Sequence, residues 1–226
     1  MDQATVQALF SAFIVIATML LVGFPVHEFM HAWTAMKLGD NTARWMGRVS
    51  LDPRVHFDQM GGLILAVTAV FSSMGGGLLF GWAKPTPVNP MNLRYGRRGH
   101  ALVAFAGPAS NLVVAFLVAV VMRVIIWSQP EASALLDLAW TTLWLLLRLN
   151  IVLFIFNLIP IPPLDGWSVL KGILPMQAAR RMTQLEIQYA HVLPMLFFGF
   201  IIILFVAGRS LLLPIIDSMT RLLLGI

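Results

Sequence analysis

Two histidines and a glutamate stand together in the segment His27–His31, which reads His-Glu-Phe-Met-His. Residues four apart on a helix lie on nearly the same face, so both imidazoles can bind one metal ion. Zinc held in this way polarises a carbonyl group and acidifies a bound water, and Glu28 could accept the proton of that water. The pattern is short and also arises by chance in soluble sequences, so its context decides its meaning.

The context is a long apolar run from Val6 to about Leu38, which Pro25 should kink. Ionisable groups inside membrane segments are costly and rarely without function. The alternative is a helix end whose polar residues simply meet water, which the nearby interface anchors Trp33 and Lys37 also fit. The density of ionisable residues in an apolar run favours a metal site.

A tetrahedral zinc site needs a third protein ligand, and this chain has ten acidic residues and no cysteine. Asp165 differs from the other acidic residues because it directly follows an apolar run and the proline cluster Pro160–Pro163. An ordinary Asp-Gly turn is the alternative for Asp165 and Gly166. The membrane topology derived below brings Asp165 to the side of the two histidines, which favours the ligand. With Asp165 and Glu28 ionised, a bound dication would also be formally neutral.

The composition predicts a membrane protein. Of the 226 residues, 59% are hydrophobic and 11% are charged, and the mean hydropathy is +0.85. We expect an all-α polytopic membrane protein, a bundle of about four to six membrane segments with a re-entrant or strand-like element near the active site. The net charge of +5 resides in short loops between apolar runs, which favours membrane orientation over nucleic-acid binding.

Further apolar runs extend over residues 101–127, 135–159 and 192–206, and the sequence allows the last run to continue to Leu213. The polar loop 39–58 contains alternating residues such as Arg48–Leu51 that could pair as short strands, and 176–189 fits a helix on the cytoplasmic surface. We expect a single integral-membrane domain over 1–226, with a core of about 20–175 and a C-terminal membrane segment of about 190–213.

Basic residues set the predicted topology. They flank the apolar segment 60–82 on both sides, recur after the third run and are missing from the loop 128–134. Under the positive-inside rule, 60–82 is then most simply a re-entrant hairpin turning at Gly75–Gly77, with an ordinary full span as the alternative. The N-terminus lies outside, and the ends of the first and third runs meet at the cytoplasmic face.

Three motifs in this order resemble the site-2 protease family of zinc intramembrane metalloproteases: His27–His31, Gly107–Asn111 and Asn157–Gly166. The resemblance covers about residues 20–175 and implies that His27, His31 and Asp165 bind one Zn²⁺ per chain, with Glu28 as general base. It also implies that Asn157, Asn111, Gly107 and Pro108 lie near the substrate. The segment 81–89 resembles the strand-like element of the family, which could clamp an extended substrate.

From these observations we predict an intramembrane endopeptidase that hydrolyses peptide bonds in transmembrane or membrane-associated segments of other proteins. We expect the minimal form without PDZ or CBS domains, in a prokaryotic cell (inner) membrane, with the active site toward the cytoplasmic side. The expected partners are membrane-protein substrates and the lipid bilayer, with no nucleic acid. The alternatives are a metal or proton transporter and an inactive relative that binds membrane segments without cutting them, and Glu28→Gln would separate the three.

Overall fold

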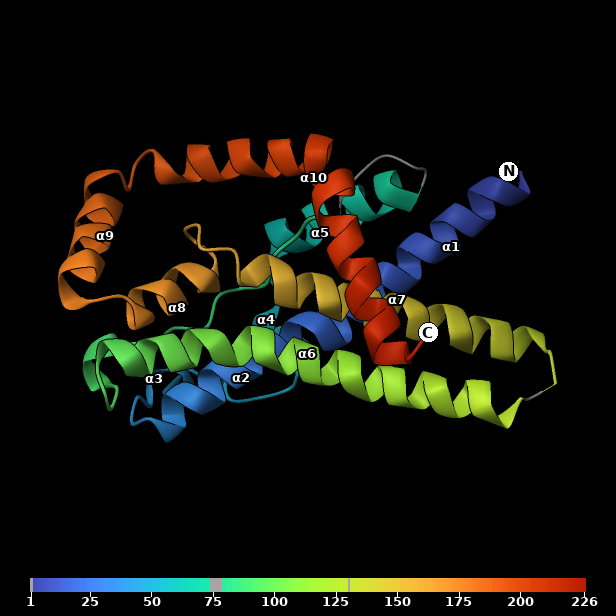
Figure 1. The fold of residues 1–226 in the computed structure, drawn as a ribbon, viewed down its shortest axis with the longest axis horizontal. Helices are drawn as coiled ribbons and strands as arrows, with labels where there is room; N and C mark the ends of the chain where they lie inside the picture. Colours follow the sequence, from blue (N-terminus) through green and yellow to red (C-terminus); the bar gives the residue numbers. More distant parts are fainter. Residues whose placement is uncertain (1, 74–78, 130) are drawn as a thin grey trace.

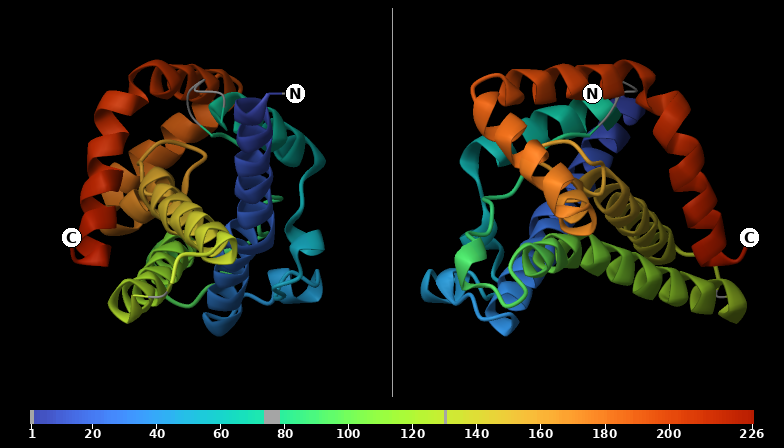
Figure 2. Two further views of the ribbon diagram at one scale, coloured as in Figure 1. Left: turned by 90° about the vertical axis from the view of Figure 1, so that its right-hand side faces the viewer. Right: turned by 60° about the vertical axis from the view of Figure 1, so that its left-hand side comes forward.

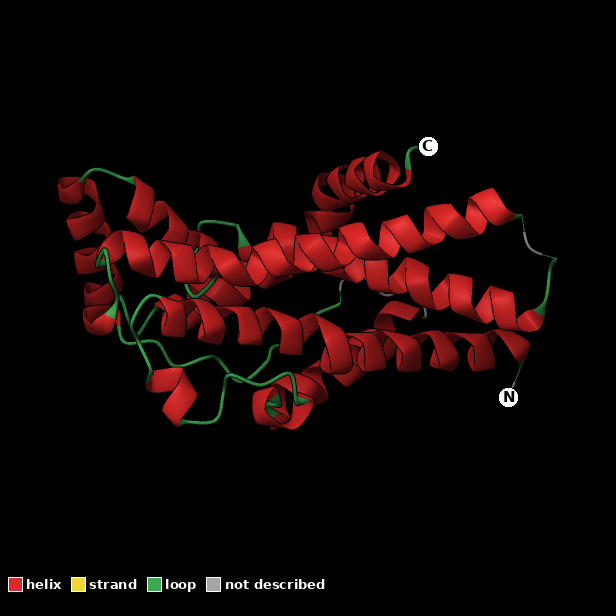
Figure 3. Cartoon of the chain, turned by 90° about the horizontal axis from the view of Figure 1, so that it is seen from below, coloured by secondary structure: helices red, strands yellow, loops and turns green. Residues whose placement is uncertain are grey.

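The structure is a computed structural model that describes residues 2–73, 79–129 and 131–226, and these residues form helices joined by loops, with no strand among them (Figures 1 and 3). The predicted helical bundle is confirmed. The elements in chain order are α1 Gln3–Thr18, η1 Met19–Gly23, α2 Phe24–Lys37, α3 Thr42–Trp45, α4 Pro53–His56, α5 Gln59–Ser73, η2 Pro90–Asn92, α6 Arg97–Ser128, α7 Ala134–Asn157, α8 Asp165–Ile173, α9 Met176–Gln188 and α10 Leu193–Leu224.

The first apolar run forms one continuous helical segment, Thr5–Lys37, long and apolar enough to cross a membrane. Its α-helical pattern is interrupted by η1, a π-helical turn that ends two residues before Pro25. A wider turn accommodates the proline, which lacks a backbone donor. Gly23, at the end of this turn, lies against α7, because a Cβ atom there would be 3.0 Å from the Leu153 side chain.

Helices α6 and α7 are the other two long candidate spans among the described residues. They pack antiparallel to each other (Figure 1), with α6 also against α2 and α7 also against α1 and η1. The N-terminus lies at the same end of the bundle as the α6–α7 connection, and α8 lies at the opposite end (Figure 1). This arrangement agrees with the alternation of sides that the charge pattern predicts.

Helix α5 packs against α1 (Figure 2) and forms one arm of a hairpin. At 15 residues it is about 22 Å long, shorter than the roughly 30 Å hydrocarbon core of a bilayer. The following chain returns along it: the Thr68 hydroxyl donates to the Phe80 carbonyl at 2.7 Å, and the Phe80 N–H lies 3.1 Å from the same hydroxyl. This geometry fits a re-entrant hairpin, although the proposed turn at Gly75–Gly77 lies outside the described residues.

The expectation of short strands near Arg48–Leu51 was wrong. The loop after α2 instead contains the one-turn helices α3 and α4. Local hydrogen bonds explain the difference: the Asp52 side chain caps α4, and the Arg48 N–H donates to the Ala43 carbonyl behind α3. Residues 79–89 also form no strand and have no regular secondary structure.

Helices α9 and α10 complete the chain. The surface helix predicted at 176–189 is α9, and it meets the beginning of α10 at 99°. If this bent pair crosses the membrane as one span, the described chain has four candidate spans, otherwise three. Helix α10 continues past the predicted end near 213, with Pro214 inside it. It turns so that its last part packs on α6 and α7, where Ile216 and Leu224 join their shared apolar core (Figures 1 and 2).

Candidate metal centre

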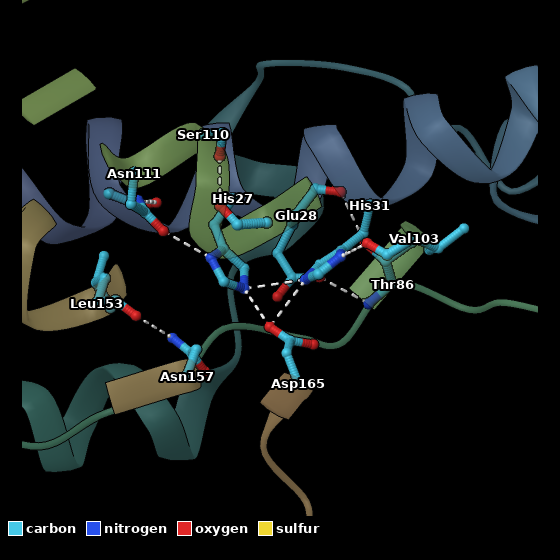
Figure 4. Close-up of polar contacts among 12 residues, drawn as sticks. His27, Glu28, His31, Thr86, Val103, Ser110, Asn111, Leu153, Asn157 and Asp165 are labelled. Carbon is cyan, nitrogen blue, oxygen red and sulfur yellow. Dashed lines mark hydrogen bonds and ion pairs between the residues drawn. The ribbon is translucent and has the colours of Figure 1, made fainter. Parts of the chain in front are cut away.

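Three potential metal ligands converge where α2, α6 and α8 meet (Figure 4). His27 and His31 lie one helical turn apart on α2, and Asp165 is the first residue of α8. The Asp165 Oδ2 atom is 3.1 Å from the Nε2 atom of His27 and 3.3 Å from that of His31. The two Nε2 atoms are 3.0 Å apart. Residues 138 positions apart in the chain therefore present one nitrogen–nitrogen–oxygen triangle.

The size and chemistry of this triangle fit zinc. Zinc–nitrogen and zinc–oxygen bonds of about 2.0–2.1 Å in a tetrahedron place neighbouring ligand atoms about 3.3 Å apart. The three observed separations are 3.0, 3.1 and 3.3 Å, so a small expansion would admit the ion. The imidazoles are nearly closed to solvent, whereas the Asp165 side chain stays 21% exposed. The site is buried and still open on one side.

The other ring nitrogens of both histidines have acceptors that fix the direction of the rings. His31 Nδ1 lies 2.7 Å from the carbonyl oxygen of Val103, and His27 Nδ1 lies 2.7 Å from Oδ1 of Asn111. A carbonyl only accepts, so His31 Nδ1 must carry a proton, and Nε2 is the nitrogen that could turn a lone pair toward a metal ion in the triangle. Such outer hydrogen bonds typically orient metal-binding histidines.

Two glycines allow the elements to approach this closely. A Cβ atom on Gly107 of α6 would overlap the His31 ring and would lie 2.7 Å from Nε2 of His27. A Cβ atom on Gly166 would overlap the carbonyl group of Leu158, where the chain folds back after α7. The first glycine makes room for the imidazoles, and the second makes room for the turn that delivers Asp165.

Charge in the site favours an ionised carboxylate. Burial raises the pKa of the Asp165 carboxyl group, but the positive charge of a protonated His31 and the hydrogen bonds that protonated His27 and His31 would donate outweigh it and hold this pKa below its usual range. Asp165 is therefore present as an anion, the form that binds a cation.

Glu28 is half-buried beside the triangle and is anchored by the non-helical segment after α5 (Figure 4). Its Oε2 atom accepts the N–H of Thr86 at 2.8 Å, and its backbone carbonyl accepts the Thr86 hydroxyl at 3.0 Å. The Arg48 guanidinium fixes the same segment by donating from Nη2 to the carbonyls of Lys84 and Pro85 at 3.0 and 2.8 Å. The segment 84–86 thus couples Arg48 to Glu28.

The remaining predicted residues lie around the triangle in different ways. Asn157 ends α7 and donates to the Leu153 carbonyl at 3.0 Å, and it is partly exposed beside Asp165 (Figure 4). Pro108 is buried inside α6 next to Gly107. Asn111 is completely buried behind His27, so its contacts are with the protein interior and not with an open substrate surface. This placement differs from the substrate-side position expected for Asn111.

Sequence reasoning missed three groups that touch the site: the Val103 carbonyl, Thr86 and Arg48. A backbone carbonyl leaves no trace in the sequence, and Thr86 lies in a proline-rich stretch without periodicity. Arg48 was one basic residue among several in a loop. Its burial, at 6% exposure, is the signal that sets it apart, and that signal appears only in the structure.

Comparison with known proteins agrees with this geometry. The family model for peptidase family M50 matches residues 123–204, which include α7, α8 and Asp165. A relative from Bacillus subtilis (strain 168), YwhC, is 36% identical over 207 residues, covering 88% of this chain and 84% of the relative. This chain belongs to peptidase family M50, the site-2 protease family. The resemblance inferred from the three motifs is confirmed.

A second M50 relative, Rip2 of Mycobacterium tuberculosis (strain H37Rv), is 33% identical over 205 residues, covering 90% of this chain and 71% of the relative. Both relatives carry the name "Putative zinc metalloprotease". No solved structure matches the chain. Membership in M50 and the three long apolar helices make this chain an integral-membrane metalloprotease.

Proposed function

We propose that this M50 protein is a zinc-dependent intramembrane endopeptidase in which His27, His31 and Asp165 hold one zinc ion and Glu28 is the general base. The observation that carries the proposal is the convergence of three ligand atoms within 4.8 Å of one another, two of them on a membrane-spanning helix. The names of the relatives support zinc as the metal.

Zinc bound by these residues would supply a Lewis acid that polarises a peptide carbonyl and acidifies a water molecule. Glu28 would accept the proton of the attacking water on its carboxylate and return it to the leaving nitrogen. The Thr86 N–H holds one carboxylate oxygen, Oε2, so the other oxygen, Oε1, is the one we assign to proton transfer. This anchor limits rotation of the Glu28 side chain and keeps the base beside the metal ligands.

The substrate would be a membrane segment that enters the site in an extended form. A helix occupies its own carbonyls with hydrogen bonds, so the segment must unwind locally before attack. Residues 83–89 lie in no helix and pass Glu28 at Thr86, so their main chain could pair with a substrate through hydrogen bonds. We therefore expect transmembrane or membrane-lying substrates with helix-weakening residues.

We place the site toward the cytoplasmic side of a prokaryotic cell membrane. The support is electrostatic: basic residues concentrate in the segments around α3, α4, the beginning of α6 and α9. Positive residues are enriched in cytoplasmic loops.

The decisive experiment compares wild type with Glu28→Gln for zinc content and for cleavage of a panel of single-span peptides in detergent or liposomes. We expect the variant to keep its zinc and to lose cleavage by about 10²–10⁴-fold, the usual contribution of general base catalysis. A helix-stabilised copy of the best substrate should be cleaved more slowly than its parent. Unchanged cleavage in Glu28→Gln would refute the assignment, and metal flux through wild-type liposomes without cleavage would favour a transporter.

A further inference from the structure

Two asparagines lie buried at the centre of the helix bundle, away from the substrate side of the metal centre. Asn111 of α6 and Asn150 of α7 are 0% and 1% exposed, and both stand in predominantly apolar helices. Buried amides are unfavourable unless they are hydrogen-bonded, and polar residues within membrane segments usually have a function. The two amides contact each other, with Asn111 Nδ2 donating to Asn150 Oδ1 at 2.9 Å.

Backbone carbonyls fix the direction of every bond in this pair. One terminal atom of the Asn150 side-chain amide lies 2.8 Å from the Leu146 carbonyl oxygen, and one of the Asn111 amide lies 3.1 Å from the Gly23 carbonyl oxygen. Carbonyl oxygens only accept, so the NH₂ group of each asparagine must be the group that points at them. Asn150 therefore turns its oxygen toward Asn111, and Asn111 must turn its own oxygen toward His27.

The consequence reaches the metal site. Asn111 Oδ1 lies 2.7 Å from His27 Nδ1, so that nitrogen must carry the proton and donate it. His27 Nε2 is then the nitrogen that could turn a lone pair toward a metal ion in the triangle formed with His31 and Asp165. The two histidines differ in their support, because His31 is oriented by a backbone carbonyl and His27 by a side chain. A side chain can rotate unless something else holds it.

We propose that Asn150 is a positioning residue for the metal centre: through Asn111 it orients the His27 imidazole toward the metal. The Asn150 side chain does not contact His27, His31 or Asp165 directly. It acts through two hydrogen bonds, one from Asn111 on α6 to Asn150 on α7 and one between Asn111 and His27 on α2. The inference rests on the proposed function, in that His27 is taken as a zinc ligand. Asn111 keeps its bond to the Gly23 carbonyl without Asn150, so the effect of losing Asn150 should be partial.

The test measures metal binding directly. Asn150→Leu keeps the approximate side-chain volume and removes both polar contacts. We expect zinc affinity to fall by about 10-fold, the lower end of the 10–100-fold loss typical for outer partners of metal ligands. The zinc dissociation constant is measured by competition with a chromophoric chelator, and the ligand field by the absorption spectrum of the Co²⁺-substituted protein, which should change.

A second variant and a control separate positioning from packing. Asn150→Ser can still donate its hydroxyl to the Leu146 carbonyl but is too short to reach Asn111, so it should fold and show the same loss of zinc affinity. Ile151→Ala removes packing at the neighbouring, completely buried position of α7. It should lower thermal stability while leaving the zinc affinity and the cobalt spectrum as in wild type.

Wild-type zinc affinity and an unchanged cobalt spectrum in Asn150→Ser would overturn the proposal, and so would an equal loss of zinc affinity in Ile151→Ala. Both readouts are independent of proteolysis. If wild-type protein cleaved none of the peptides, the proposed function would fail, while the binding measurements would still decide the role of Asn150.

Discussion

Gly107→Ala is the substitution whose effect can be worked out most fully from the structure. The new Cβ atom would overlap the His31 imidazole, with its Cε1 atom 2.5 Å away, and would lie 2.7 Å from His27 Nε2. Ordinary contact begins near 3.4 Å. The rings would therefore have to move by roughly 0.7–1.1 Å, the larger value applying to the His31 ring, whereas zinc–ligand distances tolerate about 0.2 Å.

The magnitude follows from this mismatch. A ligand displacement of several times the tolerated range should weaken zinc binding at least as much as losing an outer-sphere partner, about 10–100-fold. A misplacement near 1 Å can also lower turnover by about 10²-fold in protein that is loaded with zinc. Alanine is the better helix former by about 1 kcal/mol, so α6 itself should still form.

The assay is zinc titration together with peptide cleavage at saturating zinc. Gly199→Ala is the matched control, because a Cβ atom at Gly199 in α10 meets nothing within 4 Å. We expect the control to bind and cleave as wild type does. Gly107→Ala protein with wild-type zinc affinity and turnover would refute the view that Gly107 makes room for the ligands.

Two further predictions concern the segments around the site. Arg48→Ala removes both hydrogen bonds to the carbonyls before Thr86, so the segment that anchors Glu28 should loosen. Because charged hydrogen bonds contribute about 1.5–3 kcal/mol, turnover should fall about 10–100-fold while zinc affinity stays unchanged. Arg54→Ala is the control and should have no effect, because the Arg54 side chain is 90% exposed. Burial raises the pKa of the Asp40 carboxyl, but the hydrogen bonds it accepts outweigh burial and hold that pKa below 3.8. The stabilisation of loop 39–58 by ionised Asp40 should thus be complete above pH 3.8 and be lost as the pH falls through the lowered pKa. Limited proteolysis of this loop at different pH values can follow the loss. Asp40→Asn should abolish the pH dependence.

Much of the candidate site could be predicted from the sequence because its ligands belong to rare residue types in this chain. A chain with ten acidic residues and no cysteine offers few third ligands, and the positive-inside rule then selects among them. That rule places the ends of the first and third apolar runs together, and the 3.1 Å separation of His27 and Asp165 confirms the meeting. The helices themselves followed from long apolar runs, which have few alternatives in lipid.

The rest could not be predicted because it depends on contacts between segments without a periodic pattern. The stretch Arg48–Leu51 alternates like a strand, yet side-chain caps and a turn hydrogen bond determine its backbone. The C-terminal membrane segment was expected over about 190–213, and the helix that contains it, α10, continues to Leu224 through Pro214 because its C-terminal part packs on α6 and α7. Asn150 was visible as a polar residue in an apolar run, but its direction became clear only from its partners.

The three proposed ligands are oriented by different kinds of support, and this difference predicts where the site is most sensitive. His31 is held by a main-chain carbonyl of α6, which only movement of the helix can displace. Asp165 is placed by the turn that Gly166 permits at the beginning of α8. His27 depends on a side-chain amide, whose orientation a single substitution can release. Substitutions away from the triangle should therefore act on metal binding mainly through His27, unless they displace a whole helix.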